Sequence, residues 1–286
     1  MPSLIDIRRR IRSVRNTQQI TKAMKMVSAA KLRRAQDRVM RSRPYGAMLR
    51  SVLENLAAAA AQDEEAAQNE LIARRHEANI LLVLVTADKG LAGAFNTNLV
   101  KGAQRFMAEH RDATVKLELI GRKGRDFFRK RRAAITGESI GLANKPAYAD
   151  TAAVAQRAME LYRRAEIDAV YLLYNEFKSV VAQKLTVSRV LPVEMPAGPG
   201  ALDYIFEQPP AAMLDALLPR YVEMEFFHAL IESSAAEHAA RMTAMEAATS
   251  NANEMIDKLT LFLNRVRQAS ITKEIIEVVS GAAAAG

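Results

Sequence analysis

The turn with the clearest chemical potential is Thr86-Ala87-Asp88-Lys89-Gly90-Leu91-Ala92-Gly93, which joins a strongly apolar stretch to a helical one. A glycine-bearing turn that follows a strand can bind phosphate through its backbone N–H groups. This turn has the spacing of neither G-x-G-x-x-G nor G-x-x-x-x-G-K-[ST]. We therefore interpret it as a structural strand-to-helix turn, and we predict no bound cofactor.

Metal and nucleophile chemistry also lack the residues that they need. No histidine has a second histidine or a carboxylate pair at the spacing of a zinc site such as H-E-x-x-H. The chain has no cysteine, and Ser139 and Ser179 lack the glycine context of a nucleophile elbow. We predict no metal, no catalytic residue and no enzymatic activity. The histidines considered are His76, His110, His228 and His238.

The longest regular pattern lies near the C-terminus, where apolar residues recur at spacings of four and three. Such a heptad pattern predicts a long helix that packs on a partner helix. At ~1.5 Å per residue, a helix from about 211 to 280 would be about 100 Å long. Three of the fifteen seam positions, His228, His238 and Thr249, are polar. The others are Leu217, Tyr221, Met224, Ile231, Ala235, Met242, Met245, Ala252, Ile256, Leu259, Leu263 and Val266.

A second heptad seam begins the chain with Leu4, Ile7, Ile11 and Val14. It becomes polar at Gln18 and Thr21, and we expect it to resume on a shifted face, a stutter, with Ile20, Met24 and Val27. The helix should run from about 3 to 43. Residues 42–46, which include Pro44 and Gly46, predict a kink or break, and helical composition resumes over 48–61.

The charge distribution suggests which helix pairs with which. Residues 1–43 carry 13 Lys/Arg and 2 Asp/Glu, whereas residues 207–286 carry 6 and 11. The two ends are therefore expected to pair antiparallel, with residue numbers that sum to about 270. That register predicts that Arg33 faces Glu237 and that Arg38 faces Glu232. It leaves an apolar helix tip after about Thr272, which needs a socket on another protein.

Between these helices the pattern alternates between strands and helices. The buried, alternating strands favour a small Rossmann-like α/β domain with a largely parallel sheet. Strands are expected at 79–86, 114–120, 168–177 and 181–190, and helices at 99–110, 123–132 and 151–165.

The predicted fold class is thus α plus α/β, a long antiparallel coiled coil of the terminal helices with the α/β domain inserted. The expected domain limits are a helix at 1–61 with a kink near 44, a linker at 62–77, the α/β domain at 78–195, a Pro/Gly-rich connector at 196–210, and a helix at 211–286. The longest strongly apolar run, 78–87, is about half the length needed to span a bilayer.

A basic coiled coil could also be a nucleic-acid-binding or scaffold protein. In basic zippers the arginines precede the seam. Here they are interleaved with seam residues and opposed by acidic residues far downstream. We therefore keep this class only as the alternative.

Both ends of the chain carry specific motifs. The first is Ile7-Arg8-Arg9-Arg10-Ile11-Arg12-Ser13-Val14-Arg15-Asn16-Thr17-Gln18-Gln19-Ile20-Thr21-Lys22-Ala23-Met24-Lys25-Met26-Val27-Ser28-Ala29-Ala30-Lys31, and the second is Asn264-Arg265-Val266-Arg267-Gln268-Ala269-Ser270-Ile271-Thr272-Lys273-Glu274-Ile275-Ile276-Glu277-Val278-Val279-Ser280-Gly281-Ala282. Together with Ser42-Arg43-Pro44-Tyr45 and Gly90-Leu91-Ala92-Gly93-Ala94-Phe95-Asn96, they closely resemble the gamma subunits of F-type (F1Fo) ATP synthases of the bacterial type. The resemblance extends over the whole chain.

The resemblance implies a central rotor shaft that turns with the proton-driven c-ring and acts on catalytic beta subunits during ATP synthesis or hydrolysis. The implied partners are the alpha, beta, epsilon and c-ring subunits of an alpha3 beta3 gamma delta epsilon assembly, without nucleic acid. The implied location is the cytoplasmic side of the cell (inner) membrane, where the chain would be peripheral and held through the complex.

The resemblance also implies contact residues. Those for the alpha/beta ring are Lys22, Met24, Lys25, Arg241, Arg267, Gln268, Thr272, Ile275 and Val279, and those for the c-ring and epsilon are Tyr204, Ile205 and Glu207.

Overall fold

A computed structural model describes residues 3–60, 69–195 and 208–284 of the chain. The chain divides into two compact units. Met1–Ser28 and Met242–Gly286 form one, here called the coiled-coil unit, and Ala29–Arg241 form the other, the α/β unit. Two long helices, α1 (Leu4–Ala60) and α6 (Pro210–Ala284), contribute to both units.

A five-stranded sheet is the centre of the α/β unit, in the order β3-β2-β1-β4-β5. The first four strands in this order are parallel, and β5 pairs antiparallel with β4 at the edge. Six residues of β1 are buried because helices cover both faces of this strand. The strands are β1 (Asn79–Val85), β2 (Thr114–Ile120), β3 (Ile135–Ser139), β4 (Ala169–Phe177) and β5 (Gln183–Leu191).

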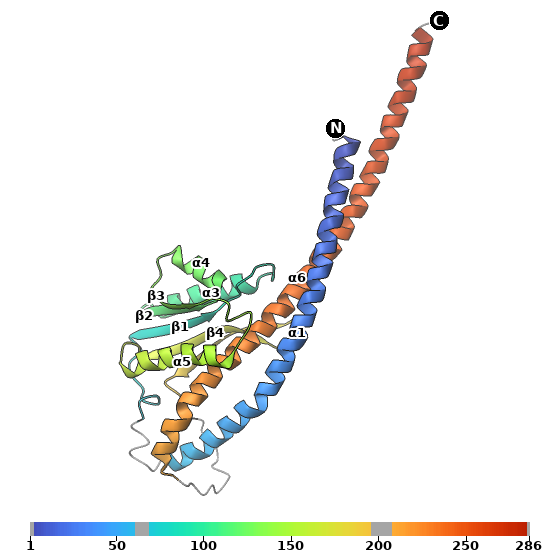
Figure 1. Cartoon of the computed structure of the whole chain (residues 1–286). Helices are drawn as coiled ribbons and strands as arrows, with labels where there is room; N and C mark the ends of the chain where they lie inside the picture. The colour runs from blue at the N-terminus through green and yellow to red at the C-terminus, as the bar shows by residue number, and fades with distance from the viewer. Residues whose placement is uncertain (1–2, 61–68, 196–207, 285–286) are drawn as a thin grey trace. The chain divides into compact units, whose positions relative to one another are not determined.

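Two layers of helices enclose the sheet (Figure 1). Helices α3 (Phe95–Glu109) and α4 (Arg122–Arg129) pack on one face through apolar side chains such as Phe106 and Phe128. Helix α5 (Tyr148–Arg163) and the first part of α6 pack on the other face. The long terminal helices and the mainly parallel sheet confirm the predicted fold class.

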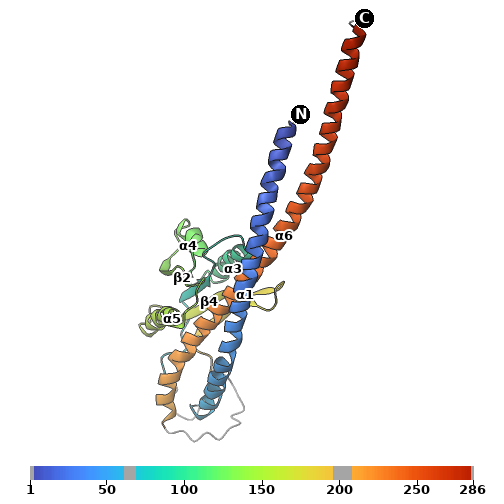
Figure 2. The same ribbon diagram turned by 45° about the vertical axis from the view of Figure 1, so that its right-hand side comes forward.

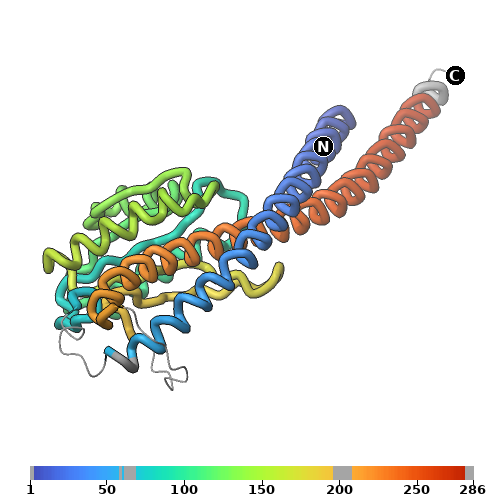
Figure 3. The backbone as a smooth tube through the Cα atoms, turned by 60° about the horizontal axis from the view of Figure 1, so that its bottom comes forward, coloured from blue at the N-terminus to red at the C-terminus, as the bar shows by residue number. Residues whose placement is uncertain are grey.

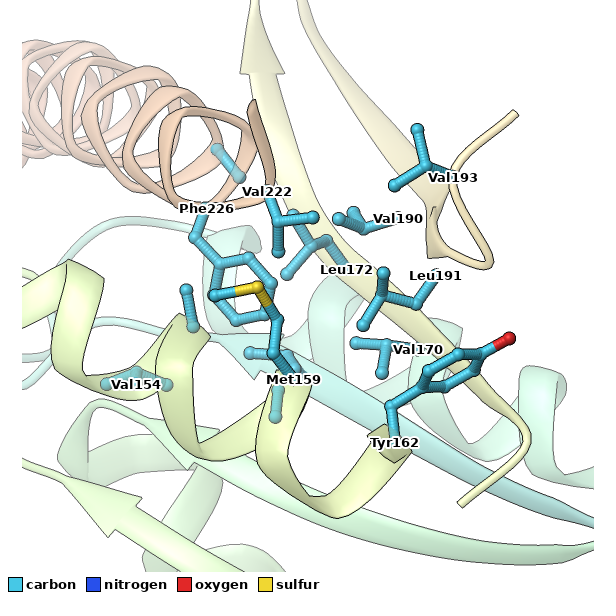
Figure 4. Close-up of a cluster of buried hydrophobic side chains, with 14 of the residues drawn as sticks. Val154, Met159, Tyr162, Val170, Leu172, Val190, Leu191, Val193, Val222 and Phe226 are labelled. Atoms are coloured by element: carbon cyan, nitrogen blue, oxygen red, sulfur yellow. The ribbon is translucent and has the colours of Figure 1, made fainter. Parts of the chain in front are cut away.

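The first part of α6 is anchored in the larger apolar core. Val222 and Phe226 of α6 meet Met159 of α5 and Leu172 of β4 there (Figure 4). Further along, every residue from 229 to 239 is buried. Within the α/β unit this part of α6 lies between the sheet and α1 (Figure 3). A helix that is buried on all sides is fixed to its surroundings along its whole circumference.

The strands match their expected positions closely, with one omission. Strand β2 has the predicted limits, and β1, β4 and β5 differ by one or two residues at their ends. Strand β3 was not predicted, because Ile135-Thr136-Gly137-Glu138-Ser139 is short and mostly polar and contains a glycine. A Cβ at Gly137 would lie 2.7 Å from Cδ of the buried Glu118, so a larger residue there would make the Glu118 side chain shift.

Helix α1 has no break at residues 42–46. The backbone stays helical through Pro44, although proline cannot donate the usual hydrogen bond to the preceding turn.

Beyond α1, Leu71 is buried, and its carbonyl oxygen accepts a hydrogen bond from the N–H of Val193.

Candidate functional site

The two helices of the coiled-coil unit run antiparallel and meet through polar pairs (Figure 2). The hydroxyls of Thr21 and Thr249 are 2.8 Å apart, and Lys25 Nζ lies 2.5 Å from a carboxylate oxygen of Glu246. Gln18 donates to the side chain of Asn253. The paired numbers sum to 270 or 271, which confirms the predicted register within this unit.

The predicted stutter in α1 is wrong. Thr21 and Ser28 are buried in the seam, whereas Ile20 and Val27 point outward and are 59% and 56% exposed. The heptad therefore continues on one face through its polar positions. The polar residues can remain in the seam because Gln18 and Thr21 find partners on α6.

The two predicted ion pairs in the α/β unit are also wrong. Glu237 pairs with Arg241 on its own helix at 2.5 Å, and Glu232 lies 3.7 Å from Arg43. Arg38 instead donates to the carbonyl oxygen of Pro146. Arg43–Glu232 and Arg50–Glu225 both have numbers that sum to 275, so the register near 270 does not extend to this unit.

Eight of the predicted ring-contact residues lie in the coiled-coil unit, where they form a surface rather than a pocket. Lys22 is exposed, and Met24 and Lys25 are partly buried beside the seam. On α6 the exposed residues are Arg267, Gln268, Thr272, Ile275 and Val279. All residues from 271 to 280 are exposed, and within this unit α6 continues past the N-terminal end of α1 (Figure 1).

The sequence analysis missed apolar residues on the outer face of this unit. Met26 and Leu261 are 64% and 71% exposed, and Met255 and Phe262 are also exposed. These residues could have been recognised in the sequence because they are apolar and lie outside the heptad positions of the seam. Apolar side chains outside a seam have no partner within a two-helix coil, which points to an enclosing protein.

Arg241 occupies a different environment from the other predicted contacts. Its side chain is only 11% exposed, and it pairs with Glu237. The same guanidinium donates to the carbonyl oxygen of Gly90 at 3.2 Å. Arg241 therefore holds the Gly90 turn against α6. Tyr204, Ile205 and Glu207 lie outside the described residues.

The turn after β1 is occupied by its own carboxylate. Asp88 accepts hydrogen bonds from the N–H groups of Arg122, at the start of α4, and Gly141. These are the kind of backbone donors that a phosphate would use. The geometry therefore agrees with a structural turn. Across the residues that the structure describes, no three His, Asp or Glu side chains group as metal ligands do.

His238 is buried in the α/β unit beside two cations. Burial, together with Arg241 and Lys31, lowers the pKa of His238 to about 4. The nearby carboxyl of Glu237 has a raised pKa, mainly because it is buried. The histidine is therefore neutral at physiological pH, and its protonation opposes folding.

Acid should destabilise the α/β unit through His238. The pKa of His238 in the folded chain lies below the unfolded value of 6.5. The stabilisation that depends on neutral His238 is therefore fully present above about pH 6.5. It is lost as the pH falls toward about 4 and amounts to roughly 3 kcal/mol or less. Between pH 7.5 and pH 5, the free energy of unfolding measured with urea should fall less for His238→Gln than for the unmodified chain. Glu237 is present in both proteins, so its contribution cancels when they are compared. An equal fall in both would contradict the lowered pKa of His238.

None of the helices among the described residues is both apolar enough and long enough to span a membrane.

Known proteins resemble this chain over its full length. A family model described as ATP synthase matches residues 3–285. The ATP synthase gamma chain of Solibacter usitatus (strain Ellin6076) is 74% identical over 285 residues, 100% of each chain. That of Anaeromyxobacter sp. (strain Fw109-5) is 52% identical over 99% of each chain.

Solved structures share the fold. A chain in the central stalk and c-ring structure of Tetrahymena thermophila mitochondrial ATP synthase has a TM-score of 0.64 and 26% identity, over 80% of this chain and 99% of that one. A chain in Euglena gracilis mitochondrial ATP synthase, rotational state 3, has a TM-score of 0.67 and 20% identity, over 98% and 94%. The chain therefore belongs to the family of ATP synthase gamma chains.

Proposed function

We propose that this chain is the central rotor shaft of an ATP synthase. It passes torque between a c-ring, turned by proton flow, and the beta subunits, which carry the catalytic sites. The chain itself is a non-catalytic subunit. Its partners are the alpha, beta, epsilon and c-ring subunits, and the family membership and the central-stalk likeness support this assignment.

The observation that carries the proposal is a local inversion of polarity in the coiled-coil unit, around Thr21 and Thr249. Thr21 and Thr249 lie in its seam, whereas Ile20 and Val27 lie outside. An isolated coiled coil would be stabilised by the opposite arrangement. The inversion favours a shaft that is surrounded by other subunits and whose two helices are held by a few directional pairs.

The proposal extends to the ring contacts that the resemblance implies. Lys22, Met24 and Lys25 on α1, and Arg267, Gln268 and Thr272 on α6, meet the alpha and beta subunits. The exposed cations Lys22 and Arg267 face carboxylates there, whereas Lys25 already pairs with Glu246 of this chain. Ile275 and Val279 lie in the apolar tip, which turns inside the top of the ring. Arg241 is the remaining ring contact that the resemblance implies, and it also holds the Gly90 turn.

We assign the contacts with the c-ring and epsilon to Tyr204, Ile205 and Glu207, as the resemblance implies. The chain is part of a membrane-bound complex and is peripheral to the membrane. Its position is on the cytoplasmic side of the cell (inner) membrane.

Assembly with purified subunits tests the proposal. The chain should co-purify with alpha and beta in a three-three-one ratio, free of nucleic acid. Replacing both outward residues, Ile20→Gln with Val27→Gln, should weaken assembly about tenfold or more, because apolar surface is no longer buried. Gln19→Asn, at an exposed polar position on the same helix, is the matched control. Co-purification with nucleic acid instead of alpha and beta would contradict the proposal.

A further inference from the structure

A buried carboxylate joins three elements of the α/β unit. The side chain of Glu232 on α6 is only 3% exposed. One of its oxygens accepts a hydrogen bond from the N–H of Phe177, at the end of β4, at 3.1 Å. Its other oxygen lies 3.7 Å from Nη2 of Arg43 on α1 and 3.6 Å from Nε2 of His228. Glu232 thus connects α6 to the sheet and to α1.

Apolar side chains of α1 pack against α6 nearby, but the packing beside Glu232 is incomplete. Arg43 and His228 also line a cavity of about 530 Å³ between α1, α6 and the sheet. The cavity includes Gly46, where a Cβ would meet only the end of Met224 at 3.9 Å. Side chains do not fill this space, and Arg43 and Glu232 join α1 to α6 beside it, between the buried α1 residues Val39 and Leu49. A carboxylate is costly to bury, and it persists only with such partners.

A second ion pair on the same helices provides a comparison. Arg50 and Glu225 join α1 to α6 at 3.8 Å, close to the 3.7 Å of Arg43 and Glu232. The two arginines are similarly exposed, at 57% and 59%. The carboxylate of Glu225 is 26% exposed, compared with 3% for Glu232. Partly exposed pairs contribute little, whereas removing one partner from a buried carboxylate is strongly unfavourable.

We propose that Glu232 is a positioning residue that locks α6 to β4 and α1, so that the sheet and the shaft turn together under load. The inference rests on the proposed rotor function. It also gives a role to the Ser42-Arg43-Pro44-Tyr45 motif, whose arginine supplies the α1 side of the junction.

The lock should matter most when the rotor works against a load. In complete complexes reconstituted into vesicles, Glu232→Gln should lower proton-driven ATP synthesis at least about fivefold, since it removes the charge of the buried carboxylate that pairs with Arg43 and accepts from Phe177. ATP hydrolysis without a proton gradient should stay within about twofold, because an unloaded shaft transmits little torque. Arg43→Gln should have the same effect, and Arg43→Lys should restore synthesis. Glu225→Gln is the matched control and should leave both rates unchanged.

Hydrogen exchange provides a direct structural measurement. The amide of Phe177 should exchange at least about tenfold faster in Glu232→Gln, because the neutral acceptor is weaker and the junction opens more often. Glu225→Gln should not change it. Unchanged exchange, or equal loss of synthesis and hydrolysis, would overturn the inference.

Two further outcomes are distinguishable. If complexes with Glu232→Gln fail to assemble, Arg43→Gln breaks the same ion pair at its exposed partner. The comparison of synthesis with hydrolysis can then be made with that variant. If unmodified complexes do not couple proton flow to ATP synthesis, the proposed function fails. If they couple normally and both variants couple equally well, only the inference about Glu232 fails.

Discussion

A disulfide between the shaft and a beta subunit should stop ATP turnover almost completely. The chain contains no cysteine, so Met24→Cys or Gln268→Cys introduces a single thiol that can be joined to a cysteine placed in beta. Gln268 is exposed and Met24 is partly buried, both in the coiled-coil unit. A rotor that is covalently fixed to one beta subunit cannot act on the other two.

The control for this experiment is chemical. Reducing the disulfide should restore turnover in the same sample, which separates the cross-link from any effect of the substitution. Full turnover with the cross-link intact would show that the shaft does not need to rotate.

The largest effect on folding is expected for Gly121→Ala. Gly121 has φ of 95°, and a Cβ there would lie 2.7 Å from the carbonyl carbon of Thr86. Backbone cannot move away as a flexible side chain can. The positive φ and the clash together should lower the free energy of unfolding by roughly 4 kcal/mol. Urea unfolding followed by circular dichroism measures this change.

Gly141→Ala separates the two contributions. Gly141 has φ of 89°, but a Cβ there would meet nothing within 4 Å. This variant should lose only about 1–3 kcal/mol, through backbone strain alone. An equal loss in the two variants would show that the close approach of Gly121 to Thr86 does not matter.

Much of the fold could be predicted because its elements repeat a simple period. Strands β1 and β4 contain runs of buried apolar residues, and β2 alternates apolar and polar residues, so that all three could be predicted nearly to the residue. Edge strand β3 was missed because it is short and mostly polar, so its position depends on pairing with β2 rather than on its own composition.

The seam could be predicted only where apolar residues fill it. Ile20 and Val27 predict a shifted face, because apolar residues are usually buried, but both are exposed. Thr21 stays in the seam because its hydroxyl pairs with the hydroxyl of Thr249, which is far away in the sequence. The residues next to Thr21 in the sequence do not indicate this pairing.

The exposure of the proposed contact residues could be predicted only in part. The exposed residues on α6, such as Gln268 and Ile275, follow from the terminal motif. The burial of Arg241 does not, because it depends on the approach of the Gly90 turn to α6. The outer residues Met26 and Leu261 were overlooked because they lie off the seam.

The most direct test of the central claim is to watch the chain turn. A bead can be attached through Lys101→Cys, an exposed position on α3, in complexes whose alpha and beta subunits are fixed to a surface. Adding ATP should produce sustained rotation in one direction. ATP hydrolysis at the normal rate while the bead stays still would contradict the proposed rotor function.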